Sequence, residues 1–166
     1  MLCALLRLIC ARGRGQVGDN GGQTYSGHSN APLRGGKFNW FEGGTRSAAF
    51  VAAGAGSKHL SAEARGQIYR HPVHMTDWLP TLADLAGVPR ADWPQGPELG
   101  LDGVSLVGPG GVVLPQLEKP VRQEMLLSIQ TGFEVDSKLP GWGRWGVIRQ
   151  GDYKLITQDV NWNYVT

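Results

Sequence analysis

The chain has 166 residues, which is enough for one domain with a modest hydrophobic core. Its hydrophobic fraction of 41% argues against a disordered chain, and its 25 glycines, about twice the usual ~7%, occur without the triplet repeat of collagen. The net charge is only +2 and no basic block is present, so nucleic acid is not expected as a partner.

Residues 1–10 (MLCALLRLIC) form the apolar run at the N-terminus. This run is shorter than the ~20 apolar residues of a membrane span, and no membrane span is expected. As a signal peptide it lacks a basic first region and a small-x-small cleavage site, and Arg7 interrupts it. We interpret residues 1–16 as an atypical, truncated or misjoined, N-terminal segment. Its Cys3 and Cys10 are the two cysteines, so no disulfide framework is indicated.

A long loop is expected next. Residues 12–18 are rich in Gly and Arg and predict coil, and residues 19–44 show no hydrophobic period. Long loops in compact domains are usually functional or disordered. The aromatic cluster Phe38, Trp40 and Phe41 favours a loop that is anchored.

The segments after this loop predict one strand and one helix. Residues 47–53 (SAAFVAA) are a short apolar run typical of a buried strand in a covered sheet, and residues 57–67 are a surface loop or a short helical turn. Residues 74–87 predict a helix whose apolar face is Trp78, Leu79, Leu82, Leu85 and Ala86. Thr76 or Asp77 would cap its start, Pro80 would lie in or just after the first turn, and Gly87 would end it.

The C-terminal part predicts a small antiparallel sheet. Residues 90–117 carry many prolines and glycines and are expected to be a connection. Residues 124–129 predict a strand, and residues 146–157 predict a hairpin that turns at Gly151-Asp152. The chain then stops without a closing element, which suggests a truncated subdomain over residues 118–166.

Asp19 and Asn20 carry the first chemical signal. A carboxylate and an amide oxygen suit a hard cation such as Ca²⁺, and Gly21-Gly22 allows the backbone to turn sharply beside them. Two ligands do not complete a site of about six to eight. Asp-Asn-Gly-Gly is also the composition of an ordinary turn, and on these four residues alone the turn is favoured.

Lys37 is the candidate oxyanion contact. It follows Gly35-Gly36, whose bare backbone N–H groups and the lysine ammonium suit an anion, although an isolated lysine is more often a solvated surface residue. Arg34 and Arg46 are alternatively structural ion-pair partners, for example of Glu42.

The histidines give a weaker signal. His28 lies in the same loop and is kept as a candidate site residue. The remaining ones, His59, His71 and His74, form no pair with the spacing of zinc enzymes.

Six motifs follow one another in a distinctive order. They are Asp19-Asn20-Gly21-Gly22, Asn30-x-Pro32-Leu33-Arg34-Gly35-x-Lys37, Glu42-Gly43-Gly44-x-Arg46, Thr76-Asp77-Trp78-Leu79-Pro80-Thr81-Leu82, Leu101-Asp102-Gly103, and Ile148-Arg149-x-Gly151-Asp152-Tyr153-Lys154-Leu155. Each is weak alone, but the ordered set resembles the second half of a sulfatase of the arylsulfatase type, with arylsulfatase B-like enzymes as the nearest match. The resemblance covers about residues 17–156.

The resemblance implies a fold and a set of roles. The fold would be α/β, part of an alkaline-phosphatase-like sulfatase fold with a smaller C-terminal antiparallel sheet. Residues 17–117 would then be the C-terminal part of the catalytic domain. Asp19 and Asn20 would ligate calcium, and Lys37 would contact the sulfate of an aromatic or glycosaminoglycan sulfate ester. Relatives are mostly lysosomal or secreted.

The resemblance also implies a missing part. The family's nucleophile, a formylglycine made from a Cys-x-Pro-x-Arg motif, has no counterpart, because neither Cys3 nor Cys10 is followed by that pattern. The expected function is therefore sulfuric ester hydrolysis by resemblance, with this chain inactive alone. The alternative is a non-catalytic, truncated product that acts through protein association. A phosphoesterase of the same superfamily ranks last, because its Asp- and His-rich bimetal site is not visible.

Overall fold

The computed structural model describes residues 8–10, 13–95, 100–114, 116, 118–130 and 145–157. The expectations for residues 1–7 and for the chain end after residue 157 lie outside the described residues. The chain forms two compact units. The loop unit comprises Met1–Arg7, Gln16–Phe50 and Glu124–Thr166, and the helix unit comprises Leu8–Gly15 and Val51–Gln123. The division predicted at residues 16 and 117 stays a prediction.

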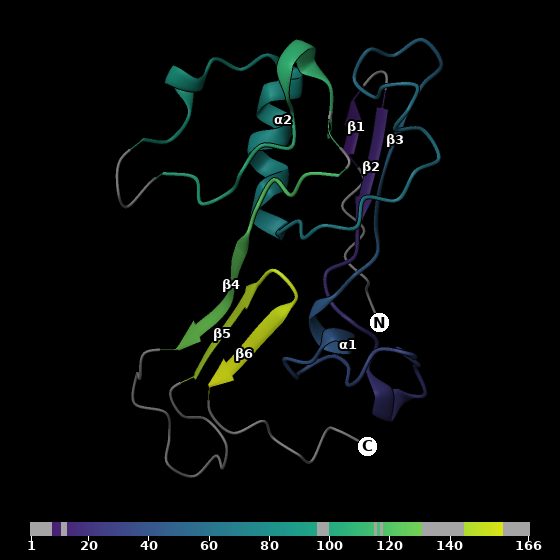
Figure 1. Ribbon diagram of the computed structural model, residues 1–166, viewed down its shortest axis with the longest axis vertical. Coiled ribbons are helices and arrows are strands. Elements are labelled where there is room, and N and C mark those ends of the chain that lie inside the picture. The colour runs from purple at the N-terminus through teal and green to yellow at the C-terminus, as the bar shows by residue number, and fades with distance from the viewer. Residues whose placement is uncertain are drawn as a thin grey trace. The chain divides into compact units, whose positions relative to one another are not determined.

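The first sheet has the strand order β1-β2-β3, formed by Leu8–Cys10, Gly13–Val17 and Ala49–Ala53 (Figure 1). The coil expected for residues 12–18 is wrong, because antiparallel pairing of β1 with β2 overrides the low strand propensity of Gly and Arg.

The strand expected within residues 47–53 forms as β3, but it is not buried. Phe50 is 52% exposed. An apolar run is buried only where other layers cover both faces of the strand. Besides this sheet, the described ranges contain two α-helices, α1 (Glu42–Thr45) and α2 (Trp78–Ala86), and a second three-stranded sheet.

The predicted helix is present, with a different start. A 3-10 turn, η2 (Met75–Asp77), leads into α2, and Gly87 ends it in the left-handed conformation at φ 73°. Asp77, one of the two predicted cap residues, occupies the N-cap position of α2, but its side chain makes no cap bond to that helix. The side-chain cap lies one turn earlier, at η2, where the His74 ring accepts from the Thr76 N–H and the Asp77 carboxylate accepts from the His74 N–H at 2.8 Å. Pro80 lies in the first turn of α2, as expected.

The apolar face of α2 differs from the prediction at two positions, because both Leu79 and Ala86 are exposed. Leu79 is 58% exposed, whereas Trp78, Pro80 and Thr81 are buried. The Thr81 hydroxyl accepts from the Leu106 N–H at 2.9 Å, which holds this side of the helix inward and turns Leu79 to solvent. The connection expected for residues 90–117 is confirmed in its described part. It contains the short 3-10 turns η3 (Arg90–Asp92) and η4 (Pro109–Gly111) and one bridge between Val107 and Val113.

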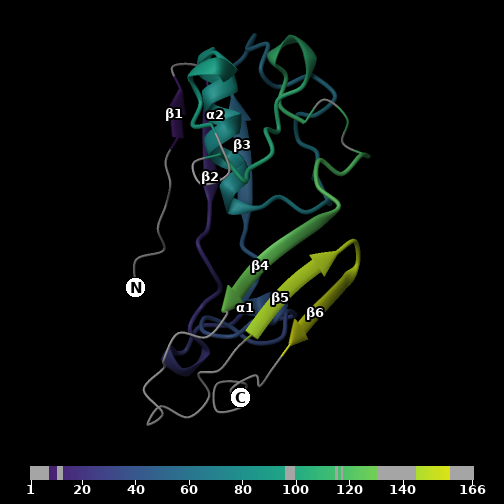
Figure 2. The same ribbon diagram turned by 90° about the vertical axis from the view of Figure 1, so that its left-hand side faces the viewer.

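The predicted C-terminal sheet is confirmed. It is antiparallel, in the order β4-β5-β6, formed by Glu124–Gln130, Trp145–Gln150 and Tyr153–Thr157 (Figures 1 and 2). Gly151 adopts φ 55° in the two-residue turn between β5 and β6. Figure 2 shows α1 behind this sheet, so one face of the sheet is turned toward the long loop and the other is turned away.

Helices together with an antiparallel sheet are compatible with the predicted α/β class. The described apolar core is small: Ala64, Trp78, Leu106 and Val113 are buried in the helix unit, and Met125 and Val147 in the loop unit. In the ranges described, no helix is long and apolar enough to cross a membrane.

Candidate functional site

The long loop is fastened by one amide side chain. Asn30 Oδ1 accepts from the Gly22 N–H at 2.7 Å, and Asn30 Nδ2 donates to the carbonyls of Gly22 and Gly35 at 2.8 and 3.1 Å. The Lys37 N–H also donates to the Gly22 carbonyl, at 3.1 Å. Asn30 therefore ties the segment that follows Asp19 to the segment that ends in Lys37.

Glycines allow these segments to touch. We call the set Gly21, Gly22, Gly35, Gly36, Gly43 and Gly44 the glycine crossing. A Cβ atom at Gly21 would overlap the Gly43 carbonyl oxygen, and one at Gly36 would overlap the Gly22 carbonyl oxygen. Two backbone bonds close the crossing, from Gly21 N to Gly44 O at 3.2 Å and from Gly43 N to Arg34 O at 2.7 Å. Three motifs that are separate in the sequence thus lie side by side with no room for a side chain between them.

The predicted aromatic anchor differs from the expectation at Phe38, which is exposed, whereas Trp40 and Phe41 are half-buried. Phe38 is 63% exposed, and the Arg34 guanidinium lies 3.9 Å from the centroid of the Phe41 ring. The loop is also held by Asn30 and by the glycine crossing, because short backbone approaches and a half-buried amide satisfy polar groups that an aromatic ring cannot.

Asp19 and Asn20 lie just beyond the end of β2. Asp19 is exposed, and Asn20 Nδ2 donates to Asp19 Oδ2 at 3.0 Å. The pair offers hard oxygen donors that fit part of a calcium shell. Within the described ranges no group of three His, Cys, Asp or Glu side chains gathers to complete such a shell.

His28 and Lys37 are connected to the Asp19-Asn20 segment through their contacts with Gly22. The His28 Cβ would contact a side chain at Gly22, and the Lys37 N–H bonds the Gly22 carbonyl. Lys37 Nζ lies 5.2 Å from the centroid of the Phe38 ring. No hydrogen bond or ion pair in the described part of the chain joins the ends of the His28 and Lys37 side chains to Asp19. The fold therefore brings the four predicted site residues onto adjoining segments without making them one bonded cluster.

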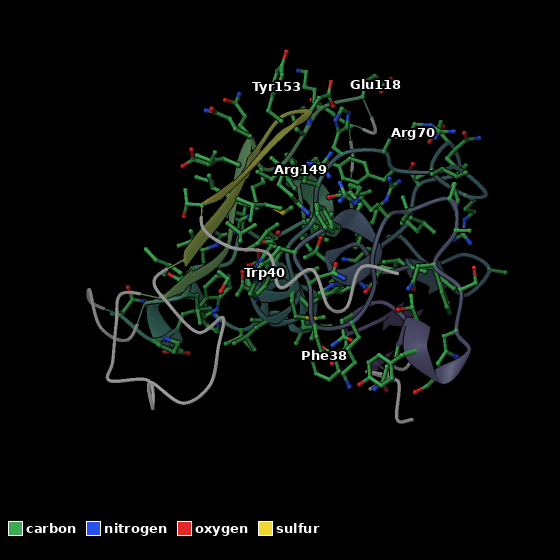
Figure 3. All side chains as sticks on the ribbon, turned by 90° about the horizontal axis from the view of Figure 1, so that it is seen from below. Phe38, Trp40, Arg70, Glu118, Arg149 and Tyr153 are labelled. Atoms are coloured by element: carbon green, nitrogen blue, oxygen red, sulfur yellow. The ribbon has the colours of Figure 1, made fainter. Side chains whose placement is uncertain are left out.

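Glu42 is the centre of an ion-pair cluster in the loop unit. Its carboxylate lies 2.6 Å from Lys154 Nζ and 3.3 Å from Arg149 Nη1. Lys154 Nζ also donates to the Trp40 carbonyl at 2.9 Å and to Thr45 Oγ1 at 2.8 Å. Arg149 and Trp40, which come from the hairpin and the loop, are labelled in Figure 3. The sequence pointed to Glu42 as an ion-pair residue, and the structure pairs its carboxylate with these two hairpin cations.

The charges around Glu42 change its acidity. Burial by itself would raise the pKa of this carboxyl group. The hydrogen bond and charge of Lys154, with the charges of Arg149 and Arg46, outweigh burial and lower the pKa below its usual value. Glu42 is therefore held in its charged form.

The strand register explains why Glu42 is needed. Arg149 pairs directly with Lys154 across β5 and β6, so two cations project from the same face of the hairpin. Like charges directly opposite on a sheet are destabilising unless an acid neutralises them. The two-residue turn at Gly151-Asp152 sets this register and so places the two cations opposite each other. The sequence therefore indicated that an acidic residue should lie near them.

Asp77 organises the helix unit. It is fully buried, and its carboxylate accepts from the His74 N–H at 2.8 Å, from the Val104 N–H at 2.7 Å and from Arg122 Nε at 3.2 Å, with a further short bond from Arg122 Nη2. Arg122 Nη2 also donates to the Asp102 carbonyl at 3.1 Å. The motifs around residues 76–82 and 101–103 are therefore structural, because Asp77 joins them. Sequence reasoning missed Arg122, which has no motif around it.

Comparison with known proteins gives a partial match to a sulfatase. No family model matches the chain. The chain is 44% identical over 68 residues to arylsulfatase J of Mus musculus, and the match covers 41% of this chain. It spans about 10% of the length of that curated relative. The similarity supports a sulfatase origin for this chain.

Proposed function

We propose that this chain carries part of the site of a sulfuric ester hydrolase, in which Lys37 contacts the sulfate group. The observation that supports this most is at Gly22. Its carbonyl accepts hydrogen bonds from the side-chain Nδ2 of Asn30 and from the backbone N–H of Lys37, which places the lysine segment against the Asp19-Asn20 segment. A sulfatase relationship from the partial match with arylsulfatase J agrees with this chemistry. We further propose that the enzyme is of the arylsulfatase B-like type and that its fold is alkaline-phosphatase-like.

Each residue has a proposed role. Asp19 and Asn20 would hold a calcium ion through their side-chain oxygens, together with ligands from outside the described pair. Calcium bound there would supply positive charge next to the sulfate. The Lys37 ammonium would bind the same group and stabilise the negative charge that develops when the ester bond breaks. His28, packed on Gly22, would lie beside the bound ester as a further polar contact.

The nucleophile is not among these residues. The 166 residues contain no Cys-x-Pro-x-Arg motif, so we propose that this chain alone does not turn over sulfate esters. The substrates of the whole enzyme would be aromatic or glycosaminoglycan sulfates, and its location lysosomal or secreted.

Binding of inorganic sulfate tests the role of Lys37. We would follow the amide signals of Gly22, Gly35 and Gly36 by NMR as sulfate is added with calcium present. The expected result is a shift of these signals that is lost in Lys37→Met and kept in Lys58→Met, which removes an exposed lysine outside the loop. Equal responses of the two variants would contradict the role of Lys37.

A second titration tests the metal ligands. Calcium should shift the Asp19 and Asn20 signals with weak affinity, and Asp19→Asn should abolish the shift, since it removes the formal charge and keeps the shape. Turnover of an aryl sulfate by the chain, absent in Lys37→Met, would contradict the proposal that the chain is inactive alone.

The alternative function, association with a protein partner, also has an observation in its favour. Leu126, Ile148 and Leu155 are in register across β4, β5 and β6 and are 53%, 37% and 60% exposed. Such an apolar sheet face favours association. Sedimentation of the chain over a range of concentrations tests this reading, and a constant monomer mass, unchanged by Ile148→Lys, would argue against self-association.

A further inference from the structure

Two exposed aromatic rings lie together in the loop unit, and one of them is beside Lys37. Tyr25 is 60% exposed and Phe38 is 63% exposed. Their ring centroids are 6.5 Å apart and their planes differ by 15°, so the rings are nearly parallel and strongly offset. Phe38 is labelled on the loop surface in Figure 3. This offset arrangement leaves much of each ring open to solvent.

The backbone holds Phe38 in this position. Phe38 has φ 78°, a left-handed conformation that a bulky residue rarely adopts. The residues on either side are fastened to the glycine crossing, through Lys37 N to Gly22 O at 3.1 Å and Asn39 N to Gly36 O at 3.2 Å. Strained residues of this kind persist where the surrounding structure determines them, and they gather at binding sites.

Lys37 connects the rings to an anion. Its Nζ lies 5.2 Å from the Phe38 ring centroid, so a positive charge and an aromatic surface are adjacent. In a sulfate ester of a ring compound, the sulfate is joined to the ring through a single oxygen atom. A ligand whose sulfate meets the Lys37 ammonium would therefore place its ring near Phe38 and Tyr25.

We infer that Tyr25 and Phe38 form a stacking surface for the ring of a sulfate ester whose sulfate group contacts Lys37. This inference rests on the proposed function and adds a subsite that recognises the part of the ester that leaves. Both aromatic and sugar rings present a flat apolar face that suits such a surface.

The experiment compares three probes on the full 166-residue chain with calcium present: inorganic sulfate, 4-methylumbelliferyl sulfate and galactose 4-sulfate. Dissociation constants come from the NMR shifts of the loop amides. An aromatic stacking contact increases affinity by up to about tenfold. We expect the unmodified chain to bind a ring ester about five- to tenfold more tightly than inorganic sulfate.

The variants identify the surface. Phe38→Leu and Tyr25→Leu should remove this preference and leave the affinity for inorganic sulfate unchanged. Phe38→Tyr, which keeps the ring, should keep the preference. The control is Tyr153→Leu, because Tyr153 is 85% exposed, projects from the hairpin in Figure 3, and lies away from Lys37 in the sequence.

Each outcome is decisive. If the unmodified chain binds both ring esters no more tightly than sulfate, or if Phe38→Leu keeps the preference, the stacking surface is refuted and the role of Lys37 stands. If no probe binds, or if Lys37→Met binds sulfate equally well, the proposed function fails and the inference fails with it. If the chain binds only one of the two ring esters more tightly than inorganic sulfate, the stacking surface is supported. The preferred ester then shows whether an aromatic ring or a sugar ring occupies it.

Discussion

The buried pair of Asp77 and Arg122 allows a quantitative test of how the helix unit is held together. The side chain of Asp77 has no exposed surface, and that of Arg122 is 17% exposed. The substitution Asp77→Asn keeps the shape of the side chain but removes its charge. The new amide NH2 group then faces an Arg122 N–H donor together with the N–H of either Val104 or His74, depending on which oxygen it replaces.

The magnitude follows from burial. Removing one partner of a buried ion pair typically costs about 3–5 kcal/mol, because the other charge is left uncompensated. Arg122 keeps some access to water, so we expect the lower end, a loss of about 3 kcal/mol in the free energy of unfolding. A small domain has only about 5–15 kcal/mol in total, so this loss is large.

The chain contains a matched control. Asp84 pairs with Arg90 at 2.8 Å, but the Arg90 side chain is 68% exposed. Exposed ion pairs contribute about 0–1 kcal/mol, so Asp84→Asn should change stability by no more than that. The expected gap of about 2 kcal/mol is nearly thirtyfold in the unfolding equilibrium constant.

Urea denaturation followed by tryptophan fluorescence measures both variants. Trp78 is 6% exposed and directly follows Asp77, so its emission reports on this part of the helix unit. Hydrogen exchange of the Val104 amide gives an independent reading, because that N–H donates to Asp77 Oδ1. If the two variants lose the same stability to within about 1 kcal/mol, the claim that Asp77 organises this unit is refuted.

Three further predictions concern other parts of the chain. Because the pKa of Glu42 is lowered in the folded state, its stabilising effect should be present above the unfolded pKa and be lost as pH falls through the folded value. Denaturation at several pH values should therefore show a weaker acid dependence in Glu42→Gln, and an unchanged dependence would contradict this. Asn30→Asp removes two donors to backbone carbonyls and should cost about 1–3 kcal/mol, whereas Gln95→Glu, which removes two donors at an exposed site, should cost less in the same urea assay. Gly103→Ala should lower the melting temperature measured by circular dichroism, since its Cβ would overlap the Thr76 carbonyl oxygen, and a wild-type value would show that the backbone relaxes freely there.

Local patterns in the sequence were enough for several elements. The turn at Gly151-Asp152 determined the hairpin and its register, because a two-residue loop accepts few geometries. Gly87 and the spacing of apolar residues determined where α2 lies and where it ends, but not where it starts. The long loop followed from its glycines and its lack of any period. The candidates Asp19, Asn20, His28 and Lys37 were found by residue type and order, and their roles stay predictions.

Only the tertiary structure decided which distant residues meet. The Glu42 cluster joins residues more than one hundred positions apart, and Arg122 reaches Asp77 across forty-five. Neither pairing leaves a period or a short motif, since ion pairs depend on where backbones are placed in space. The same holds for exposure: Leu79 and Phe50 are apolar by sequence, yet they face solvent because the neighbouring elements that would cover them are set by packing. Sequence therefore determined the local elements and the candidate chemistry, and long-range contacts decided the partners that hold them.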